Sequence, residues 1–243
     1  MTPSKSFDTF SETALSSHDQ VARTLGVEII DGTYPPGSKI PNEADILARF
    51  AISRTVLREV LKTLTAKGLI VSKTRVGTKV LDPTRWNLFD ADVLSWKISQ
   101  GLDEAFHRDL TEIRLAIEPR AAALSALRRT PEAVAELRDA VAAMRVATST
   151  RRQFAEADLA FHQAIGAASG NVLMRSISAV IETALVASFT MSSPIDDPVL
   201  HDHNVRSHER IVDAIEAGDE DGAAEAMRAV IKTLAYWRDL RDL

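Results

Sequence analysis

Between residues 90 and 241, one segment after another has apolar residues at the spacing of a helix that is buried on one side. We expect helices near 90–100, 103–128, 131–147, 151–168, 172–190, 197–217 and 219–241. Thr130 with Pro131 and Asp219 are start signals, and Gly170 and Gly218 are stop signals. Because no alternating strand pattern interrupts this series, the second part of the chain is predicted to be an all-helical bundle.

Residues 19–81 carry a different pattern, in which three short helices precede two β-branched runs around a basic turn. The expected elements are a helix at 19–31 capped by Asp19, a helix at 42–50 capped by Asn42, a helix from Ser53 to Gly68, and a hairpin at 69–81. The positions expected to face inward are Ala44, Ile46, Leu47 and Phe50 in the second helix, and Val56, Leu57, Val60, Leu61 and Leu64 in the third. This order predicts a small separate domain.

The composition excludes several kinds of site. The chain of 243 residues has no cysteine, which excludes disulfides, thiolate metal sites and a cysteine nucleophile. No apolar run reaches membrane-spanning length. The Ser- and Thr-rich residues 1–18 lack the apolar core of a signal peptide and are expected to be flexible. We therefore expect a cytoplasmic protein.

The net charge of −5 is unevenly distributed. Residues 36–81 contain nine Lys or Arg and three Asp or Glu, which gives this segment a net charge of +6. The apolar stripe of the third helix leaves Arg54, Thr55, Arg58 and Lys62 on its outer face. Arginine pairs with guanine and threonine contacts the thymine methyl, so the segment indicates double-stranded DNA as a partner. The alternative is an ordinary solvated face.

A carboxylate and two imidazoles are predicted to converge in the helical part. Asp158 and His162 lie four residues apart on one helix face, and His208 shares the phase of the apolar positions around it. Such ligands on separate helices commonly build an interior site for zinc, nickel, manganese or iron. The alternative is a structural salt bridge or cap. His201 and His203 are expected to be exposed.

Arg114 is expected to be buried, because it lies between Leu110, Ile113 and Ile117 in the helical phase. Two interpretations remain open for its charge. It forms a salt bridge with Glu118, four residues further on, or it clamps the carboxylate of a ligand.

The motifs of the first part resemble those of a known family. The stretches "PPG" at 35–37, "SRTVLREVL" at 53–61, "KGLI" at 67–70 and "GTKV" at 77–80 resemble the winged helix-turn-helix of GntR-type bacterial repressors. The residues that the resemblance assigns to DNA binding are Ser53, Arg54, Thr55, Arg58, Thr74, Arg75 and Gly77. The outer face of the third helix adds Lys62, and Lys39 is a candidate replacement for an arginine contact of the family. The family often has a DNA-contacting arginine where this chain has Ala44, so that contact is expected to be absent.

The second part is similar to the all-helical FCD effector domain of the FadR branch of that family. The similarity lies in "LTEIRLAIEPRAAALSA" at 110–126, "EADLAFHQAIGAASGN" at 156–171 and "HERIVDAIEAGDEDGAAEAM" at 208–227. It implies metal ligands at Asp158, His162 and His208, with a fourth histidine lost at Val230. Either a three-ligand divalent metal persists, which we expect, or the pocket is polar and metal-free. The effector contacts that it implies are Arg114, Asp158, His162, His208 and Asn171.

The segment 85–96 resembles the sugar-acid subgroup of these regulators, which includes galactonate-operon repressors. The resemblance implies a homodimeric repressor that releases operator DNA when a small carboxylate, such as a hexonate, binds. The alternatives are a metal-dependent hydrolase, a metal sensor and a regulator that binds a larger acyl ligand. Against a hydrolase, no general base stands at a spacing comparable to His-Glu-x-x-His.

The expected domain plan has four parts. Residues 1–18 form the flexible N-terminus, 19–82 the DNA-binding domain, 83–96 the linker with the first connecting helix, and 97–241 the effector domain.

Overall fold

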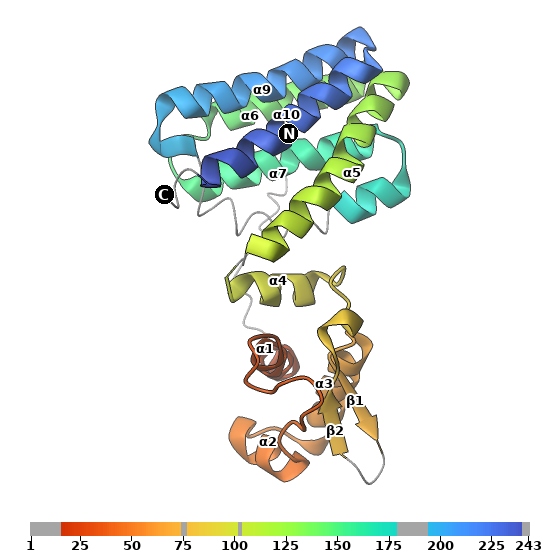
Figure 1. Ribbon diagram of the computed structural model, residues 1–243, viewed down its shortest axis with the longest axis vertical. Coiled ribbons are helices and arrows are strands. Elements are labelled where there is room, and N and C mark those ends of the chain that lie inside the picture. Colours follow the sequence, from red (N-terminus) through yellow and green to blue (C-terminus); the bar gives the residue numbers. More distant parts are fainter. Residues whose placement is uncertain (1–15, 74–76, 102–103, 179–193, 240–243) are drawn as a thin grey trace, which may run out of the picture. The chain divides into compact units, whose positions relative to one another are not determined.

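The computed structural model describes residues 16–73, 77–101, 104–178 and 194–239 (Figure 1). The chain divides into two compact units, of which the first ends at Gln100 and the second begins at Gly101. Each unit has its own apolar core. The predicted fold class is confirmed: the chain is mainly α, with a winged helix-turn-helix followed by a helical bundle.

The first unit holds the helix-turn-helix and the hairpin. Its described elements are α1 (Ser17–Ile30), α2 (Glu43–Phe50), α3 (Arg54–Ala66), β1 (Ile70–Lys73), β2 (Gly77–Val80), η1 (Pro83–Arg85) and α4 (Ala91–Ser99). The two strands pair antiparallel in a register that joins Ile70 to Val80. The segment before α2 runs beside β2, where the N–H of Ile40 donates to the carbonyl of Thr78.

Local capping decides where these helices begin. The Asn42 side chain accepts from the N–H of Asp45 and the Ser53 side chain accepts from that of Val56, so both predicted N-caps are confirmed. The prediction for α1 was wrong, because Ser16 is its N-cap and Asp19 lies inside the first turn, where its backbone N–H donates to Oγ of Ser16. The αR-to-αL change after α3 falls on Gly68, whose φ is +75°.

The predicted stripe of α3 forms the centre of the first core. Leu57, Val60 and Leu64 are fully buried there, and Val56 and Leu61 pack against them. Burying each such side chain contributes roughly 1.5–3 kcal/mol. The prediction that Ala44 faces inward was wrong: it is exposed on α2, whose buried side is centred on Ile46.

Helix α4 is part of the first unit, since Val93 and Trp96 belong to the same core. The Trp96 ring covers Gly26 of α1 so closely that a Cβ on that glycine would lie 2.2 Å from ring atom Cζ3. At the other end of α4, the buried Lys67 binds Asp90 and Asp92. The connecting helix is therefore fixed to the helix-turn-helix at two points.

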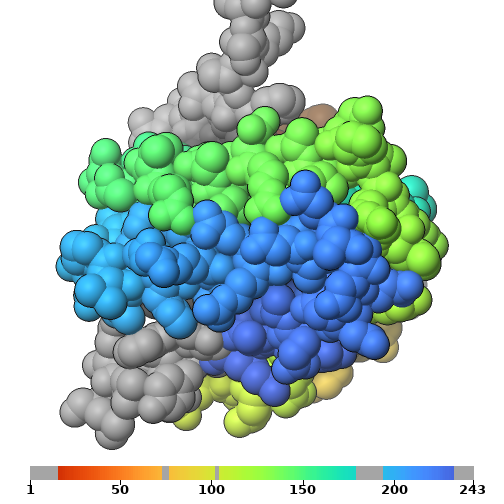
Figure 2. All heavy atoms as spheres, turned by 90° about the horizontal axis from the view of Figure 1, so that it is seen from above, coloured from red at the N-terminus to blue at the C-terminus, as the bar shows by residue number. Residues whose placement is uncertain are grey.

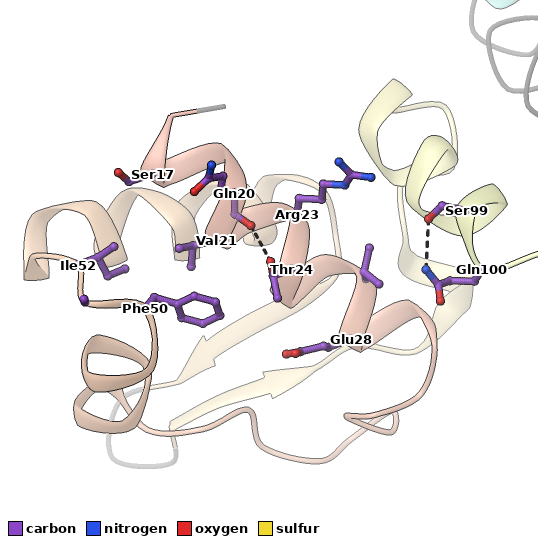
Figure 3. Close-up of a pocket in the computed structure, with 12 residues that line it drawn as sticks. Ser17, Gln20, Val21, Arg23, Thr24, Glu28, Phe50, Ile52, Ser99 and Gln100 are labelled. Atoms are coloured by element: carbon purple, nitrogen blue, oxygen red, sulfur yellow. Dashed lines mark hydrogen bonds between the residues drawn. The ribbon is translucent and has the colours of Figure 1, made fainter. Parts of the chain in front are cut away.

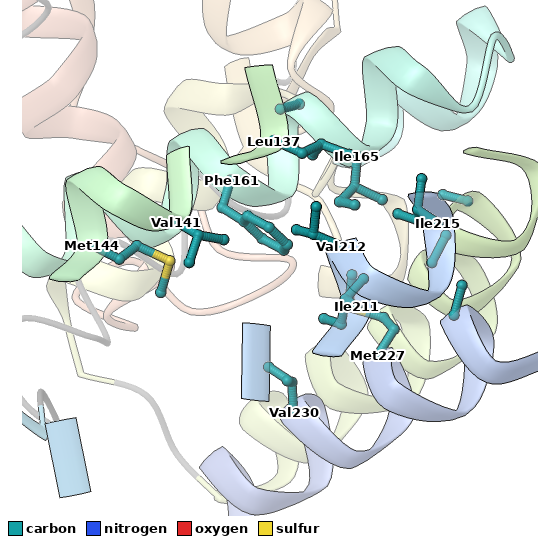
Figure 4. Close-up of a cluster of buried hydrophobic side chains, with 14 of the residues drawn as sticks. Leu137, Val141, Met144, Phe161, Ile165, Ile211, Val212, Ile215, Met227 and Val230 are labelled. Atoms are coloured by element: carbon teal, nitrogen blue, oxygen red, sulfur yellow. The ribbon is translucent and has the colours of Figure 1, made fainter. Parts of the chain in front are cut away.

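The second unit is a bundle of long helices. Its described elements are α5 (Glu104–Arg128), α6 (Pro131–Val146), α7 (Arg151–Ala168), a helical segment at 172–178, η2 (Pro194–Asp196), α9 (Pro198–Ala217) and α10 (Glu220–Asp239). The predicted helix at 172–190 is helical as far as residue 178, and its remainder lies outside the described residues. Figure 4 shows the core, in which Phe161, Ile211 and Val230 come from α7, α9 and α10.

Figure 2 shows one face of this unit, on which α9 lies between α6 and α10. Arg138 and Arg145 of α6 reach across to α9, where they bind Asp213 with Glu216 and Asp202 with Glu209 respectively. These exposed pairs add little stability individually. In the part of the chain that the structure describes, no helix has the length and apolarity needed to cross a membrane.

Candidate functional site

The predicted carboxylate–imidazole cluster is present and buried. Asp158 and His162 project from α7 and His208 from α9, with exposed fractions of 2%, 2% and 0%. Nε2 of His208 lies 3.2 Å from Oδ1 of Asp158, and Nε2 of His162 lies 3.9 Å from Oδ2. One ligand atom from each of the three residues lies within 4.8 Å of the others. The structure therefore brings together the three residues that the sequence proposes as metal ligands.

The polar atoms of this cluster are close to one another without being satisfied. Both oxygens of Asp158, both ring nitrogens of His162 and Nε2 of His208 are buried and form no hydrogen bond within the described residues. An unpaired buried polar group costs roughly 1–3 kcal/mol, and a charged one costs more. One carboxylate and two imidazoles facing one point are a donor set for a divalent cation. These residues therefore fit the metal that the family resemblance implies.

The ring of His208 is fixed in the orientation that a ligand needs. Its Nδ1 lies 2.8 Å from the carbonyl oxygen of Asn204, which can only accept, so Nδ1 donates to it and Nε2 is the nitrogen that faces Asp158. The edge-to-face ring of Phe161 contacts both imidazoles, with centroids 4.9 Å from His208 and 5.6 Å from His162. This aromatic wall keeps the cluster within an apolar surrounding.

Glu118 of α5 is a member of the site that sequence reasoning considered only as the partner of Arg114. The predicted salt bridge exists: Nε and one Nη of Arg114 donate to the two oxygens of Glu118 at 2.5 Å and 3.1 Å. Oε2 of Glu118 also lies 2.9 Å from Nδ1 of His162, at ion-pair distance but without hydrogen-bond alignment. In the sequence, the only sign that Glu118 belongs to the cluster is its i,i+4 spacing from Arg114 on a helix face expected to be buried.

The charges around the two carboxylates keep them ionised. Burial opposes ionisation of Glu118, but the charges of Arg114 and His162 outweigh burial and lower its pKa to about 2. Burial likewise opposes the charge of Asp158, while the adjacent His208 and His162 hold the pKa of Asp158 below its ordinary value. Two ionised carboxylates beside two imidazoles make the pocket suitable for a cation.

The structure also shows the surroundings of three other polar residues that the sequence singled out in the helical unit. Asn171 caps the helical segment that follows it, because its Oδ1 accepts from the N–H groups of Leu173 and Met174. The prediction that His201 is exposed was wrong: its ring is buried against Phe154, and Nε2 bonds to the carbonyl of Met144. His203 is exposed as predicted.

The outer face of α3 is a second candidate surface. Ser53, Arg54, Thr55, Arg58 and Lys62 are all exposed. Arg54 and Thr55 form the first turn, where a helix presents unpaired N–H groups and a positive dipole end. Nζ of Lys62 lies 2.8 Å from Oε1 of Glu59. This exposed ion pair is weak, so Lys62 can leave it for another anion.

The hairpin lies next to this face. Arg58 and Lys62 line a groove of about 490 Å³ together with Ser72 of β1. Exposed Lys39 pairs with the wing strand through Lys79, and its Cδ is 3.8 Å from where a Cβ on Gly77 would stand. Two further residues assigned to the wing, Thr74 and Arg75, lie outside the described residues.

The basic segment is less uniform than its charge count indicates. Arg49 binds Glu28 of α1 and stacks on Phe50, and Lys67 is buried against α4. These two of its nine cations therefore neutralise acids inside the unit. The exposed cations that remain on α3 and beside β2 form the face suited to a polyanion.

Figure 3 shows a larger concavity of about 840 Å³ in the same unit, between α1, the turn after α2 and the end of α4. Its lining includes Gln20, Arg23, Phe50 and Gln100. None of the residues predicted to bind metal, effector or DNA lines it. The buried cluster and the outer face of α3 therefore remain the two candidate sites.

Comparison with known families matches both units. Residues 17–80 match the family described as bacterial regulatory proteins, gntR family, and residues 109–233 match the FCD domain. Proteins with these domains are transcriptional regulators, so the prediction that the chain is not an enzyme is confirmed and the hydrolase alternative is set aside.

Individual relatives give the same result over nearly the whole chain. The chain is 32% identical to the galactonate operon transcriptional repressor of Escherichia coli K12, over 89% of this chain and 94% of the repressor. It is 33% identical to the uncharacterized HTH-type transcriptional regulator YieP of the same organism, over 88% and 91%. Among solved structures, Lar, which controls expression of the Listeria monocytogenes agr system, matches with a TM-score of 0.65 at 16% identity, over 90% and 95%. The chain belongs to the GntR family of transcriptional regulators and carries an FCD domain as its second unit.

Proposed function

We propose that this regulator represses genes of sugar-acid use and is released from its operator by a small carboxylate that binds beside a metal in the helical unit. The observation that carries the proposal is the set of buried, unpaired donor atoms on Asp158, His162 and His208. A divalent cation would satisfy these donors, and its open positions would suit the carboxylate and hydroxyl oxygens of a hexonate.

We propose three protein ligands for the metal, because Val230 stands where the family resemblance implies a fourth ligand. Its side chain is buried at 2% exposure within the apolar core and offers no donor. A three-residue site leaves more coordination positions to water or effector than a four-residue site does. This supports a pocket in which the effector itself completes the coordination of the metal.

Arg114 enters the proposal as the second anchor for a carboxylate. Glu118 already takes Nε and one Nη of this guanidinium. A carboxylate effector would therefore share Arg114 with Glu118 or compete with it, while a metal would attract the same effector group directly. The metal is accordingly the first anchor, and Asn171, which caps a neighbouring helix, is a weaker candidate contact.

At the DNA, we propose that Arg54, Thr55 and Arg58 meet base edges and phosphates, with Lys39, Ser53 and Gly77 in support. Their exposure on one face of α3 and its wing supports this assignment. Two copies of the chain would bind a short palindrome, since each winged unit reads one half-site. Effector binding would favour a dimer geometry that no longer fits both half-sites, by its differential affinity for the two states.

Thermal stability of the full-length protein tests the effector and metal together. A native-state ligand must raise the unfolding midpoint, so we would screen hexonates, hexuronates, other hydroxy acids and acyl-CoAs with and without a chelator. We expect one sugar acid to stabilise the protein and the chelator to remove that effect. The same stabilisation should be lost in Asp158→Asn and kept in Asp213→Asn, a matched exposed substitution on α9.

Two outcomes would contradict parts of the proposal. Stabilisation that survives the chelator would remove the metal and leave Arg114 as the main anchor. If acyl-CoAs alone stabilise the protein, the sugar-acid assignment is wrong.

A further inference from the structure

The rings of the two histidines of the cluster are oriented alike, although only His208 has its outer nitrogen in an aligned hydrogen bond. His208 has Nδ1 at the carbonyl of Asn204, 2.8 Å away, and its Nε2 faces Asp158. His162 has Nδ1 at Oε2 of Glu118, 2.9 Å away, and its Nε2 also faces Asp158. Each ring therefore has one nitrogen toward the common point and the other toward an acceptor outside it.

The two outer partners differ in charge. Asn204 offers a neutral carbonyl from the helix that carries His208 itself, whereas Glu118 offers a carboxylate from α5, a different helix. A carboxylate that accepts the outer N–H of a metal-bound imidazole fixes the ring and strengthens the inner nitrogen as a donor. Of the two histidines, His162 would gain the larger benefit.

We infer that Glu118 is a positioning residue that makes His162 a strong metal donor, and that Arg114 acts on the metal site through Glu118. This inference rests on the proposed function, because it needs a metal held by Asp158, His162 and His208. It assigns to Glu118 a role that reaches beyond neutralising Arg114.

Arg114 and Glu118 have the geometry that such a role requires. Both side chains are 5% exposed, and two N–H groups of the guanidinium hold both carboxylate oxygens. This bidentate contact prevents the carboxylate from rotating and keeps it ionised in a buried setting. Oε2 of Glu118 accepts from Nη of Arg114 and also faces Nδ1 of His162. A movement of Arg114 would therefore change the position of the carboxylate beside His162.

The inference changes how an effector would act on this pocket. A carboxylate that draws Arg114 toward itself would weaken the hold on Glu118 and thereby alter His162 as a donor. Effector and metal would then be coupled through two side chains of α5, without direct contact between Arg114 and the metal.

Cobalt binding to the full-length protein is the test, because the d–d absorption of Co²⁺ reports its ligands. We expect Glu118→Gln to bind Co²⁺ about 10–100-fold more weakly, which is the usual effect of removing an outer partner, and to shift the absorption bands. Glu118→Asp, which keeps the charge but has one methylene fewer, should lie between this variant and the native protein.

The matched control is Glu156→Gln. It makes the same chemical change on α7, the helix of Asp158 and His162, at an exposed carboxylate paired with Arg152. Its Co²⁺ affinity and spectrum should equal those of the native protein. All spectra are recorded below the unfolding midpoint of each metal-free variant, so that loss of folding is not read as loss of binding.

A double-mutant cycle tests whether Arg114 acts through Glu118. Arg114→Met should weaken Co²⁺ binding in the native background and have no further effect in Glu118→Gln. Additive losses would show that Arg114 acts independently and would overturn that part of the inference.

The remaining outcomes distinguish a failure of the role of Glu118 from a failure of the proposed metal site. Native Co²⁺ affinity and bands in Glu118→Gln would overturn the role of Glu118 while the metal site stands. If the native protein binds no Co²⁺, or Asp158→Asn binds it equally well, the proposed metal site fails and the inference fails with it.

Discussion

Nζ of Lys67, the C-cap residue of α3, lies 2.6 Å from Oδ1 of Asp90, the N-cap residue of α4. It also lies 2.7 Å from Asp92 and 5.5 Å from the centre of the Trp96 ring. Burial opposes the charge on this amine, but hydrogen bonds to Asp90 and Asp92 outweigh burial and raise the pKa of Lys67. One lysine thus joins the end of α3 to the start of α4.

Replacing Lys67 by Met should keep the packing of its stem and remove the ion pairs. We expect the first unit to lose roughly 1–3 kcal/mol of stability, the range for hydrogen bonds to charged groups. Urea denaturation measures this loss. Lys62→Met is the control, because its pair with Glu59 is exposed and its removal should change stability little. Equal effects of the two substitutions would show that the α3–α4 contact is not held by Lys67.

Arg54→Ala tests the reading face. We expect the variant to lose about 1–3 kcal/mol of specific binding and its preference at one base position, because a bidentate base contact is lost. Binding to duplexes selected by the native protein from a random pool measures this. Lys62→Ala should weaken binding to all sequences alike and lower the salt dependence. Unchanged discrimination in Arg54→Ala would remove this residue from the reading set.

We expect Glu118 to stabilise the folded protein at neutral pH and to lose this contribution in acid. Its pKa in the folded protein, about 2, is below the ordinary 4.5, so its contribution is present above pH 4.5 and lost as the pH falls toward 2. Glu118→Gln should therefore be less stable than the native protein at pH 7, by up to about 3 kcal/mol, and this difference should shrink between pH 4.5 and 2. Denaturation with chelator present isolates the effect, and a difference that stays constant with pH would contradict it.

Val230→His places an imidazole where the family resemblance implies a fourth metal ligand. Without metal the variant should be less stable by roughly 1–3 kcal/mol, since an imidazole enters an apolar core. With Zn²⁺ it should gain at least about tenfold in affinity as a further ligand. Competition with a chelating indicator measures the affinity. Val141→His, another buried valine of the same core, should show the cost without the gain. If both variants bind alike, Val230 does not adjoin the site.

Gly26→Ala should weaken the contact between α1 and α4, because the new Cβ would meet the Trp96 ring. Forcing an extra methyl into such packing costs about 1–3 kcal/mol. Trp96→Leu in the same chain should recover part of that loss. Gly166→Ala on α7 is the control, since its nearest neighbour would be 3.5 Å away and the helix gains from alanine. A neutral Gly26→Ala would mean that Trp96 moves freely.

Local rules predicted the parts of this fold that depend on neighbouring residues. Asn42, Ser53 and Gly68 were identified because a cap or an αL turn needs those residue types at that place. The N-cap of α1 was misplaced because Ser16 and Asp19 are both capping residues, and only the three-dimensional hydrogen bond decides between them. Periodicity put Ala44 inward, but a small residue on a short helix gains too little from burial to fix its phase.

The candidate cluster was predictable where its residues share a helix, and less predictable where a contact depends on how two helices pack. Asp158 and His162 follow from i,i+4 spacing, and His208 from its apolar phase. The approach of Glu118 to His162 depends on how α5 packs against α7, which spacing within one helix does not contain. His201 was expected outside because it stands near a helix start, yet Phe154 and the Met144 carbonyl draw it inward.

The attachment of α4 has a practical consequence for exchanging parts between regulators of this kind. A chimaera cut at residue 82 would remove Val93 and Trp96 from the core they complete, uncover Gly26 and leave Lys67 without its carboxylates. A cut after Gln100 keeps all of these contacts. The transferable DNA-reading module is therefore a piece of about one hundred residues that carries its own outgoing helix, and a foreign sensor should be joined beyond that helix.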